Sequence, residues 1–112
     1  MALNAKSKQD LDDFKSYILV EKNFSQHTAK AYYADILAYL IWLGEEQCED
    51  VKFSKVREYL HFIKIFDYKK TTVARKIASI RTFYKYLHRE KKVDNNPAES
   101  LISPKRPKSL PK

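Results

Sequence analysis

The chain has 112 residues and a formal net charge of +8, and 44% of its residues are hydrophobic, which is enough to bury one core. One glycine and four prolines are too few turn residues for an all-β barrel or sandwich, and they exclude a glycine-rich phosphate loop. The single cysteine excludes a disulfide framework and a cysteine-rich zinc site. No apolar run approaches the roughly 18 residues that span a bilayer, so we expect a cytoplasmic protein with no membrane partner.

Two helices are predicted in the N-terminal half. Residues 8–22 carry apolar side chains at helical spacing and follow Ser7 as a candidate N-cap. Residues 26–43 follow Ser25 as N-cap and are apolar nearly all round, which is typical of the central helix of a bundle. Gly44 comes directly after this segment, so we expect it to form a left-handed C-cap.

Two more helices are predicted beyond the acidic connector 45–53. Residues 55–66 follow Ser54 as a candidate N-cap. Residues 72–91 have the clearest amphipathic pattern of the chain, since apolar side chains recur there at spacings of four and three: Val73, Ile77, Ile80, Tyr84 and Leu87. With no strand signal, the fold class predicted is all-α, a compact four-helix bundle.

The positive charge is concentrated in the last predicted helix. Residues 69–92 carry nine basic side chains and one acidic one, whereas residues 1–68 carry nine basic and eleven acidic side chains. A block of like charge with almost no acidic i,i+4 partners is typical of an element that binds a polyanion. A merely solvated helix face is the alternative interpretation.

The face opposite the apolar stripe of this helix combines short side chains with arginines. A helical wheel places there Thr71, Arg75, Ala78, Ser79, Thr82, Tyr86 and Arg89, with Lys76, Arg81 and Lys85 on the flanks. Short side chains let a helix approach a nucleic acid closely, and arginines reach phosphates and guanine edges. The sequence therefore predicts an exposed, DNA-compatible surface on this helix.

The chain changes character after residue 94. Asn95, Asn96 and Pro97 interrupt the helical pattern, and residues 103–112 contain three prolines and four basic residues, which is typical of an extended linker. We therefore expect a helical domain over residues 1–97 and a linker over residues 98–112, with a further domain after it. No internal repeat is visible.

The sequence shows no active site. His27, His61 and His88 lack partners at metal-ligand spacing, so no metal site is predicted. Cys48 stands among acidic residues that disfavour its thiolate, which argues against a nucleophilic role. The chain itself is predicted to be neither an enzyme nor a protein with a cofactor.

Four stretches in order carry a resemblance to a known family. They are EKNFSQHTAKAYYADI (21–36), TTVARKIASIRTFYKYLHRE (71–90), NNPAESL (95–101) and SPKRPKSLPK (103–112). Together they resemble the N-terminal core-binding, SAM-like domain of tyrosine recombinases and phage integrases, and most closely the Xer type. The resemblance spans nearly the whole chain.

The resemblance implies a four-helix bundle that clamps double-stranded DNA with its second and fourth helices. A separate C-terminal catalytic domain of such proteins cuts and rejoins strands through a phosphotyrosine, and four recombinase subunits assemble in a synapse. The DNA-binding residues that it implies here are Ser25, His27, Thr28, Lys30, Lys69, Lys70, Thr71, Thr72, Arg75, Lys76, Ser79 and Arg81. Ser25 and Thr28 have an alternative role in starting a helix, and Arg81 an alternative role inside the bundle.

Two further interpretations remain open from the sequence. The domain could be a helical protein-interaction module whose basic face meets an acidic partner. It could also be an RNA-binding bundle, since charge alone does not distinguish the two nucleic acids.

Overall fold

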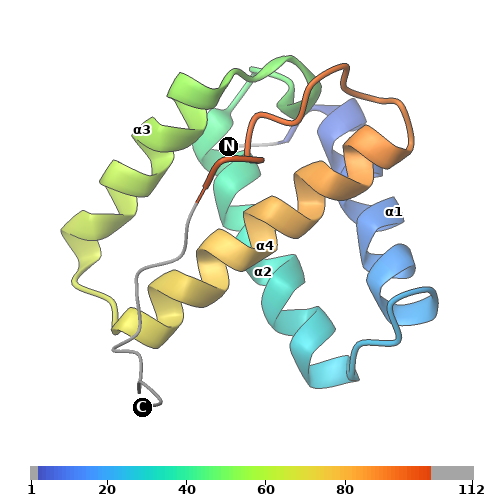
Figure 1. Cartoon of the computed structure of the whole chain (residues 1–112), viewed down its shortest axis with the longest axis horizontal. Helices are drawn as coiled ribbons and strands as arrows, with labels where there is room; N and C mark the ends of the chain where they lie inside the picture. The colour runs from blue at the N-terminus through green and yellow to red at the C-terminus, as the bar shows by residue number, and fades with distance from the viewer. Residues whose placement is uncertain (1–2, 102–112) are drawn as a thin grey trace, which may run out of the picture.

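All regular structure in the described part of the chain, residues 3–101, is helical in the computed structural model (Figure 1). Four α-helices follow one another, and short 3₁₀ turns lie in the last two connections: α1 (Ala5–Val20), α2 (Gln26–Leu43), η1 (Cys48–Asp50), α3 (Phe53–Ile63), η2 (Lys64–Phe66) and α4 (Lys70–Arg89). This confirms the predicted all-α fold with four helices. Residues 102–112, where most of the predicted linker falls, lie outside the described residues.

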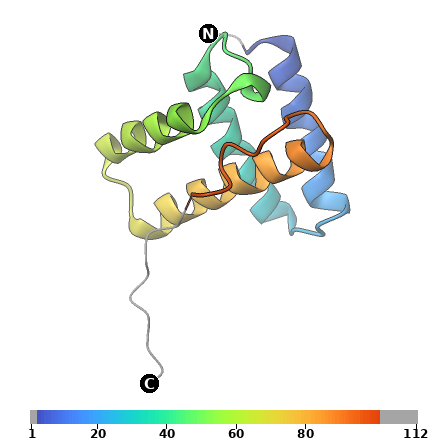
Figure 2. The ribbon, with the colours of Figure 1, turned by 45° about the horizontal axis from the view of Figure 1, so that its top comes forward.

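Helix α2 is the centre of the bundle, as its apolar composition predicts. It packs against both α1 and α4, and α4 crosses it in Figures 1 and 2. The side chains that are almost completely buried come mainly from these three helices: Leu11, Phe14, Ile18, Ile36, Tyr39, Leu40, Ile80, Phe83, Tyr84 and Leu87. Aromatic rings pack edge to face among them, for example Phe14 against Phe83.

Capping explains where the helices begin and end. The Ser25 hydroxyl accepts a hydrogen bond from an amide of the first turn of α2, so this predicted cap is confirmed. Gly44 is the C-cap of that helix as predicted and has φ at 68°, but its ψ of −120° lies outside the left-handed helical region. The other two predicted caps are wrong. Asn4 caps α1 instead of Ser7, which is buried inside the helix, and Ser54 already lies within α3.

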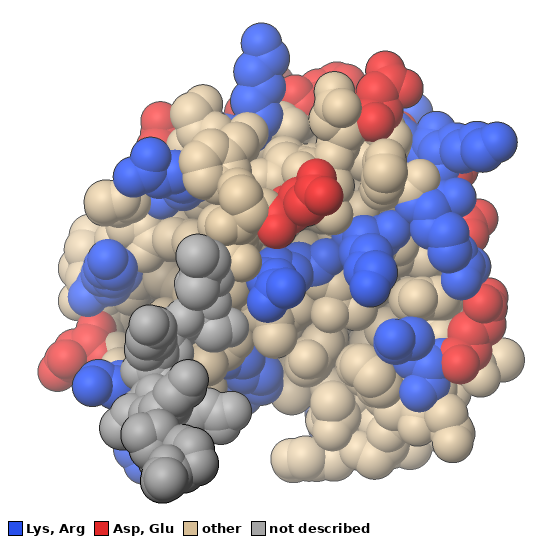
Figure 3. Space-filling model, in the orientation of Figure 1, with Lys and Arg blue, Asp and Glu red and all other residues tan. Residues whose placement is uncertain are grey.

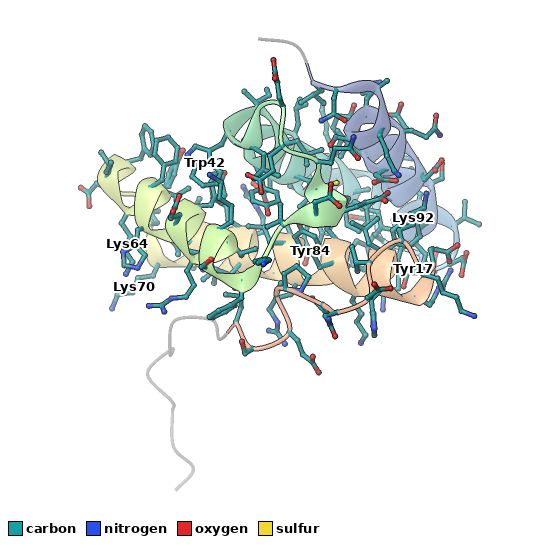
Figure 4. The ribbon with its side chains drawn as sticks, turned by 90° about the horizontal axis from the view of Figure 1, so that it is seen from above. Tyr17, Trp42, Lys64, Lys70, Tyr84 and Lys92 are labelled. Carbon is teal, nitrogen blue, oxygen red and sulfur yellow. The ribbon has the colours of Figure 1, made fainter. Side chains whose placement is uncertain are left out.

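A chain of hydroxyl groups crosses the core. The hydroxyls of Tyr39 and Tyr84 lie 2.8 Å apart, and the Tyr84 hydroxyl donates to the backbone oxygen of Cys48 at 2.9 Å. Tyr84 lies near the middle of the bundle in Figure 4. Because these polar groups are buried, the hydrogen bonds tie α2 and α4 to η1 at a fixed register.

A buried carboxyl group ties α1 to the same connector. Asp10 is 1% exposed, pairs with Lys92 at 3.2 Å and accepts a 3.6 Å hydrogen bond from the Cys48 thiol. Burial and the neighbouring Glu49 raise the pKa of Asp10 to about 6. Burial also raises the pKa of Cys48 to about 12, so the thiol is protonated and unreactive at neutral pH.

The segment after α4 folds back along that helix, as Figures 1 and 2 show. Val93, Pro97, Ala98 and Leu101 are all buried. Packing against the bundle therefore continues to Leu101.

Candidate nucleic-acid interface

The exposed face of α4 differs from the one that the helical wheel predicts. Ser79 is fully buried and Tyr86 is 8% exposed, so their predicted exposure is wrong. The reason is that α4 has neighbours on two sides: α2 covers one and α1 the other. Thr71, Arg75 and Arg89 are exposed as predicted. The exposed face extends from them toward one predicted flank, where it adds Arg81, Lys85 and His88.

A buried carboxylate organises the first half of α4. Asp35 of α2 accepts two hydrogen bonds from Arg75, both at 2.8 Å, and the two groups form a bidentate ion pair. The Ser79 hydroxyl donates to the same carboxylate at 2.8 Å, and the Lys76 ammonium lies 3.3 Å from it. Three of the predicted DNA-binding residues are thus brought together, but around an acidic group of the protein.

The ion cluster keeps a net positive charge. Burial acts to raise the pKa of Asp35, but hydrogen bonds from Arg75 and Ser79 outweigh it and hold this pKa below its ordinary value. Asp35 is therefore ionised at neutral pH and balances one of the two cations. The Arg75 side chain remains 42% exposed, whereas that of Lys76 is 12% exposed. Only Arg75 can offer a substantial part of its charge to a ligand.

Two exposed lysines stand at the start of α4. Lys69 is the N-cap residue and makes no side-chain capping bond, and Lys70 and Thr71 follow it on the surface, while Thr72 is half-buried. Neither lysine forms an ion pair within residues 3–101. Lys70 lies beside Lys64 at one end of the molecule (Figure 4), so positive charge gathers where α3 ends and α4 begins.

The start of α2 supplies the remaining predicted residues. Ser25 caps the helix through the backbone amide of Thr28 at 3.0 Å, and the hydroxyls of the two residues are also 3.0 Å apart. His27 and Lys30 are exposed. In Figures 1 and 2 α2 and α4 both begin toward the lower edge of the molecule, so the two helix starts face the same side. Such helix starts attract phosphate through their free amides and dipoles.

Ion pairing divides the basic side chains of α4 and its C-terminal turn. Besides Arg75 and Lys76, Arg89 pairs with Glu21 and Glu90, and Lys92 pairs with Asp10. Five others have no acidic partner in the described part of the chain: Lys69, Lys70, Arg81, Lys85 and Lys91. Figure 3 shows basic side chains following one another across the middle of the molecule.

The described residues do not offer two other kinds of site, a cluster of metal ligands and a membrane-spanning helix. Residues 3–101 contain no group of three or more histidine, cysteine or carboxylate side chains that could hold a metal ion. None of the described helices is both long and apolar enough to cross a bilayer.

The family model described as "Phage integrase, N-terminal SAM-like domain" matches residues 11–91. The chain belongs to this family. It is 35% identical to the tyrosine recombinase XerC of Syntrophus aciditrophicus over 90% of its own length and 36% of that protein's. It is 33% identical to XerC of Natranaerobius thermophilus, with 93% of the chain and 36% of that protein covered. XerC of Staphylococcus epidermidis is 36% identical, with 89% and 34% covered. The chain thus spans about a third of the length of these relatives, and no solved structure matches it.

Membership of the integrase SAM-like family confirms the resemblance drawn from the motifs. Sequence reasoning nevertheless missed Asp35, although the residue stands within the second-helix motif. The available signal was a carboxylate in the middle of a helix that is otherwise apolar, because such a charge needs a buried partner. The helical wheel alone predicts Lys85 on a flank and gives His88 no role, because the burial of Ser79 and Tyr86 shifts the exposed face of α4 toward these two residues.

Proposed function

We propose that this domain of the integrase SAM-like family binds duplex DNA for a site-specific tyrosine recombinase. In the relatives named XerC, about two thirds of the protein lies outside the matched region. We propose that the corresponding part of this protein carries the phosphotyrosine chemistry and that the full-length subunits assemble in a tetrameric synapse. This role fits a cytoplasmic protein.

The proposal depends mainly on one observation: several basic side chains on the exposed side of α4 and at its start have no acidic partner in the described residues. Helix α4 lies within residues 11–91, which the family model matches. Phosphate contacts supply most of the affinity of DNA-binding proteins, and a cation without an acidic partner can give its full charge to such a contact. Lys69 and Lys70 are such cations at the start of α4. We propose that they contact the backbone, with Lys30 and His27 making a second set of contacts from α2.

Within this interface we propose two kinds of role for the other predicted residues. Arg75 contacts DNA with the exposed edge of a guanidinium that Asp35 holds in place. Ser79 is buried and Lys76 nearly so, hence both act by positioning this ion pair. Thr71, Thr72, Ser25 and Thr28 lie at helix starts, where hydroxyls and amides meet phosphate oxygens.

A salt titration with duplex DNA tests the proposal. Neutralising about five phosphates gives a slope near −4 to −5 for the logarithm of the association constant against the logarithm of salt concentration. The double variant Lys69→Gln/Lys70→Gln should reduce this slope by about two. Lys8→Gln/Lys52→Gln removes the same charge from α1 and from the residue before α3, and it should leave the slope nearly unchanged.

The same measurement can refute the proposal. Absence of binding to duplex DNA at low salt would exclude a DNA-binding domain, and a preference for single-stranded RNA would favour the RNA-binding alternative. Equal effects of the two double variants would show that binding follows net charge and not this surface.

A protein-interaction module is a second candidate function, because η2 exposes an apolar surface. Ile65 is 74% exposed, Phe66 is 51% exposed and Tyr68 is 41% exposed. Contiguous apolar side chains of this kind are typical of contact surfaces between proteins. Analytical ultracentrifugation of wild type and of Ile65→Ser/Phe66→Ser would test this function. If the protein self-associates through this surface, wild type should sediment as an oligomer and the variant as a monomer.

A further inference from the structure

The exposed face of α4 and the segment that folds back along it form the walls of an open groove with a volume of about 540 Å³. Arg81, Lys85 and His88 line it from α4, and Asn96, Ala98 and Glu99 line it from the returning segment. The groove lies away from the starts of α2 and α4, where most of the DNA-binding residues implied by the family resemblance are found. Arg81 is the one residue that the two sets share.

The groove is chemically suited to a phosphate group. Arg81 and Lys85 are exposed and lie one helical turn apart, and neither has an ion-pair partner within residues 3–101. This distinguishes them from Arg75 and Arg89, whose guanidinium groups are held by carboxylates. A guanidinium and an ammonium on adjacent turns can donate to the same anion or to neighbouring phosphates.

The returning segment adds a neutral donor. The side-chain oxygen of Asn96 accepts a hydrogen bond from the backbone amide of Ala98 at 2.8 Å. This bond commits the oxygen and leaves the amide nitrogen of the Asn96 side chain as a donor. Ala78 and Thr82 also line the groove, and these short side chains leave room between the cations.

Glu99 is the one acidic side chain on the groove wall. It forms no ion pair with the described residues, so its charge opposes an incoming anion. Arg81 and Lys85 still outnumber it. The removal of Glu99 is therefore expected to act in the direction opposite to the removal of a lysine.

We infer that this groove is a phosphate-binding subsite that holds the backbone of duplex DNA beyond the contacts at the helix starts. The inference rests on the proposed function. It assigns Lys85 and Asn96 as binding residues and Glu99 as a residue that limits affinity. It also extends the DNA path along α4 toward the segment after the helix.

Variants of the groove test the inference by fluorescence anisotropy with a labelled duplex at several salt concentrations. Arg81→Gln and Lys85→Gln should each reduce the salt slope by about one, and the double variant by about two. Lys52→Gln is the matched control, because this exposed lysine lies outside the groove and has no ion-pair partner in the described residues. It should bind like wild type.

Two substitutions in the segment after α4 test whether DNA contacts the whole groove or only the face of α4. Asn96→Asp keeps an oxygen that can accept from the Ala98 amide and adds a negative charge to the groove, so it should weaken binding. Glu99→Gln should strengthen binding by up to about fivefold, the effect of about one unit charge at contact distance in water. Circular dichroism should give all variants the helix content of wild type, since these side chains are exposed or keep their bond.

The outcomes distinguish this inference from the proposed function. If wild type binds the duplex and Lys69→Gln/Lys70→Gln weakens it, but all five groove variants bind normally, the groove inference is wrong and the proposed function stands. If wild type fails to bind the duplex, both are wrong.

Discussion

The ion pair between Asp35 and Arg75 gives the sharpest prediction about the architecture of the interface. The two hydrogen bonds between them are 2.8 Å long, and the Asp35 side chain is 2% exposed. A buried bidentate pair of this kind would contribute about 3 kcal/mol. The Arg75 side chain is 42% exposed, so water screens part of the interaction, and we expect a coupling free energy of about 2 kcal/mol.

A double-mutant cycle measures this coupling. Asp35→Ala should lower the free energy of unfolding by about 3 kcal/mol, because it leaves the nearly buried Lys76 ammonium without its acceptor. Arg75→Ala should cost less, since Asp35 keeps Ser79 and Lys76 as donors. Urea denaturation of the four proteins at pH 7 gives the coupling. A coupling below about 0.5 kcal/mol would refute the view that Asp35 holds the guanidinium.

The pH dependence of the same cycle supplies an independent check. The pKa of Asp35 is lowered from its ordinary value of 3.8 by the hydrogen bonds from Arg75 and Ser79, which outweigh its burial. The folded state therefore gains stability from the ionised carboxylate above pH 3.8 and loses it as the pH falls through the lowered pKa. The coupling should be constant between pH 5 and 7 and vanish only in more acidic solution.

Three further predictions concern stability. Tyr84→Phe should lower the free energy of unfolding by about 2 kcal/mol in urea denaturation, because the Cys48 carbonyl and the Tyr39 hydroxyl lose their partner. Gly44→Ala should cost about 1 to 3 kcal/mol in the same assay, because residues with a side chain rarely adopt φ 68° with ψ −120°, although the added Cβ meets no atom within 4 Å. The raised pKa of Asp10, about 6, means that ionising this residue destabilises the fold: as the pH rises from 4 to 6, the free energy of unfolding should fall by about 2 kcal/mol. Thermal unfolding of Asp10→Asn over this range should lack that slope, and an unchanged slope would assign it to another group.

The helices could be predicted because their apolar side chains recur with one clear period. The stripe from Val73 to Leu87 placed α4 within two residues of its observed ends. Ser25 and Gly44 could be predicted as caps because each acts through the backbone next to it. Local chemistry of this kind does not depend on how the helices pack.

The orientation of α4 could not be predicted from the same periodicity. Small polar residues such as Ser79 suit a surface that approaches DNA, and they equally suit a close contact between two helices. Here the second explanation holds for Ser79, because Asp35 on α2 accepts its hydroxyl hydrogen. The two residues are separated by 44 positions, so only the packing of α2 against α4 brings them together.

This rearrangement changes which charges are available to DNA. The composition predicts nine cations in residues 69–92, and contact of all nine with phosphates would give a salt slope of about −8. The structure neutralises four of them wholly or in part through Asp35, Glu21, Glu90 and Asp10. The five that remain would by themselves give a slope of −4 to −5, and the proposed contacts of Lys30 and of the exposed part of Arg75 would make it slightly steeper. A measured slope near −8 would mean that DNA breaks these ion pairs on binding, whereas the lower value requires that the bundle docks with its acidic partners still in place.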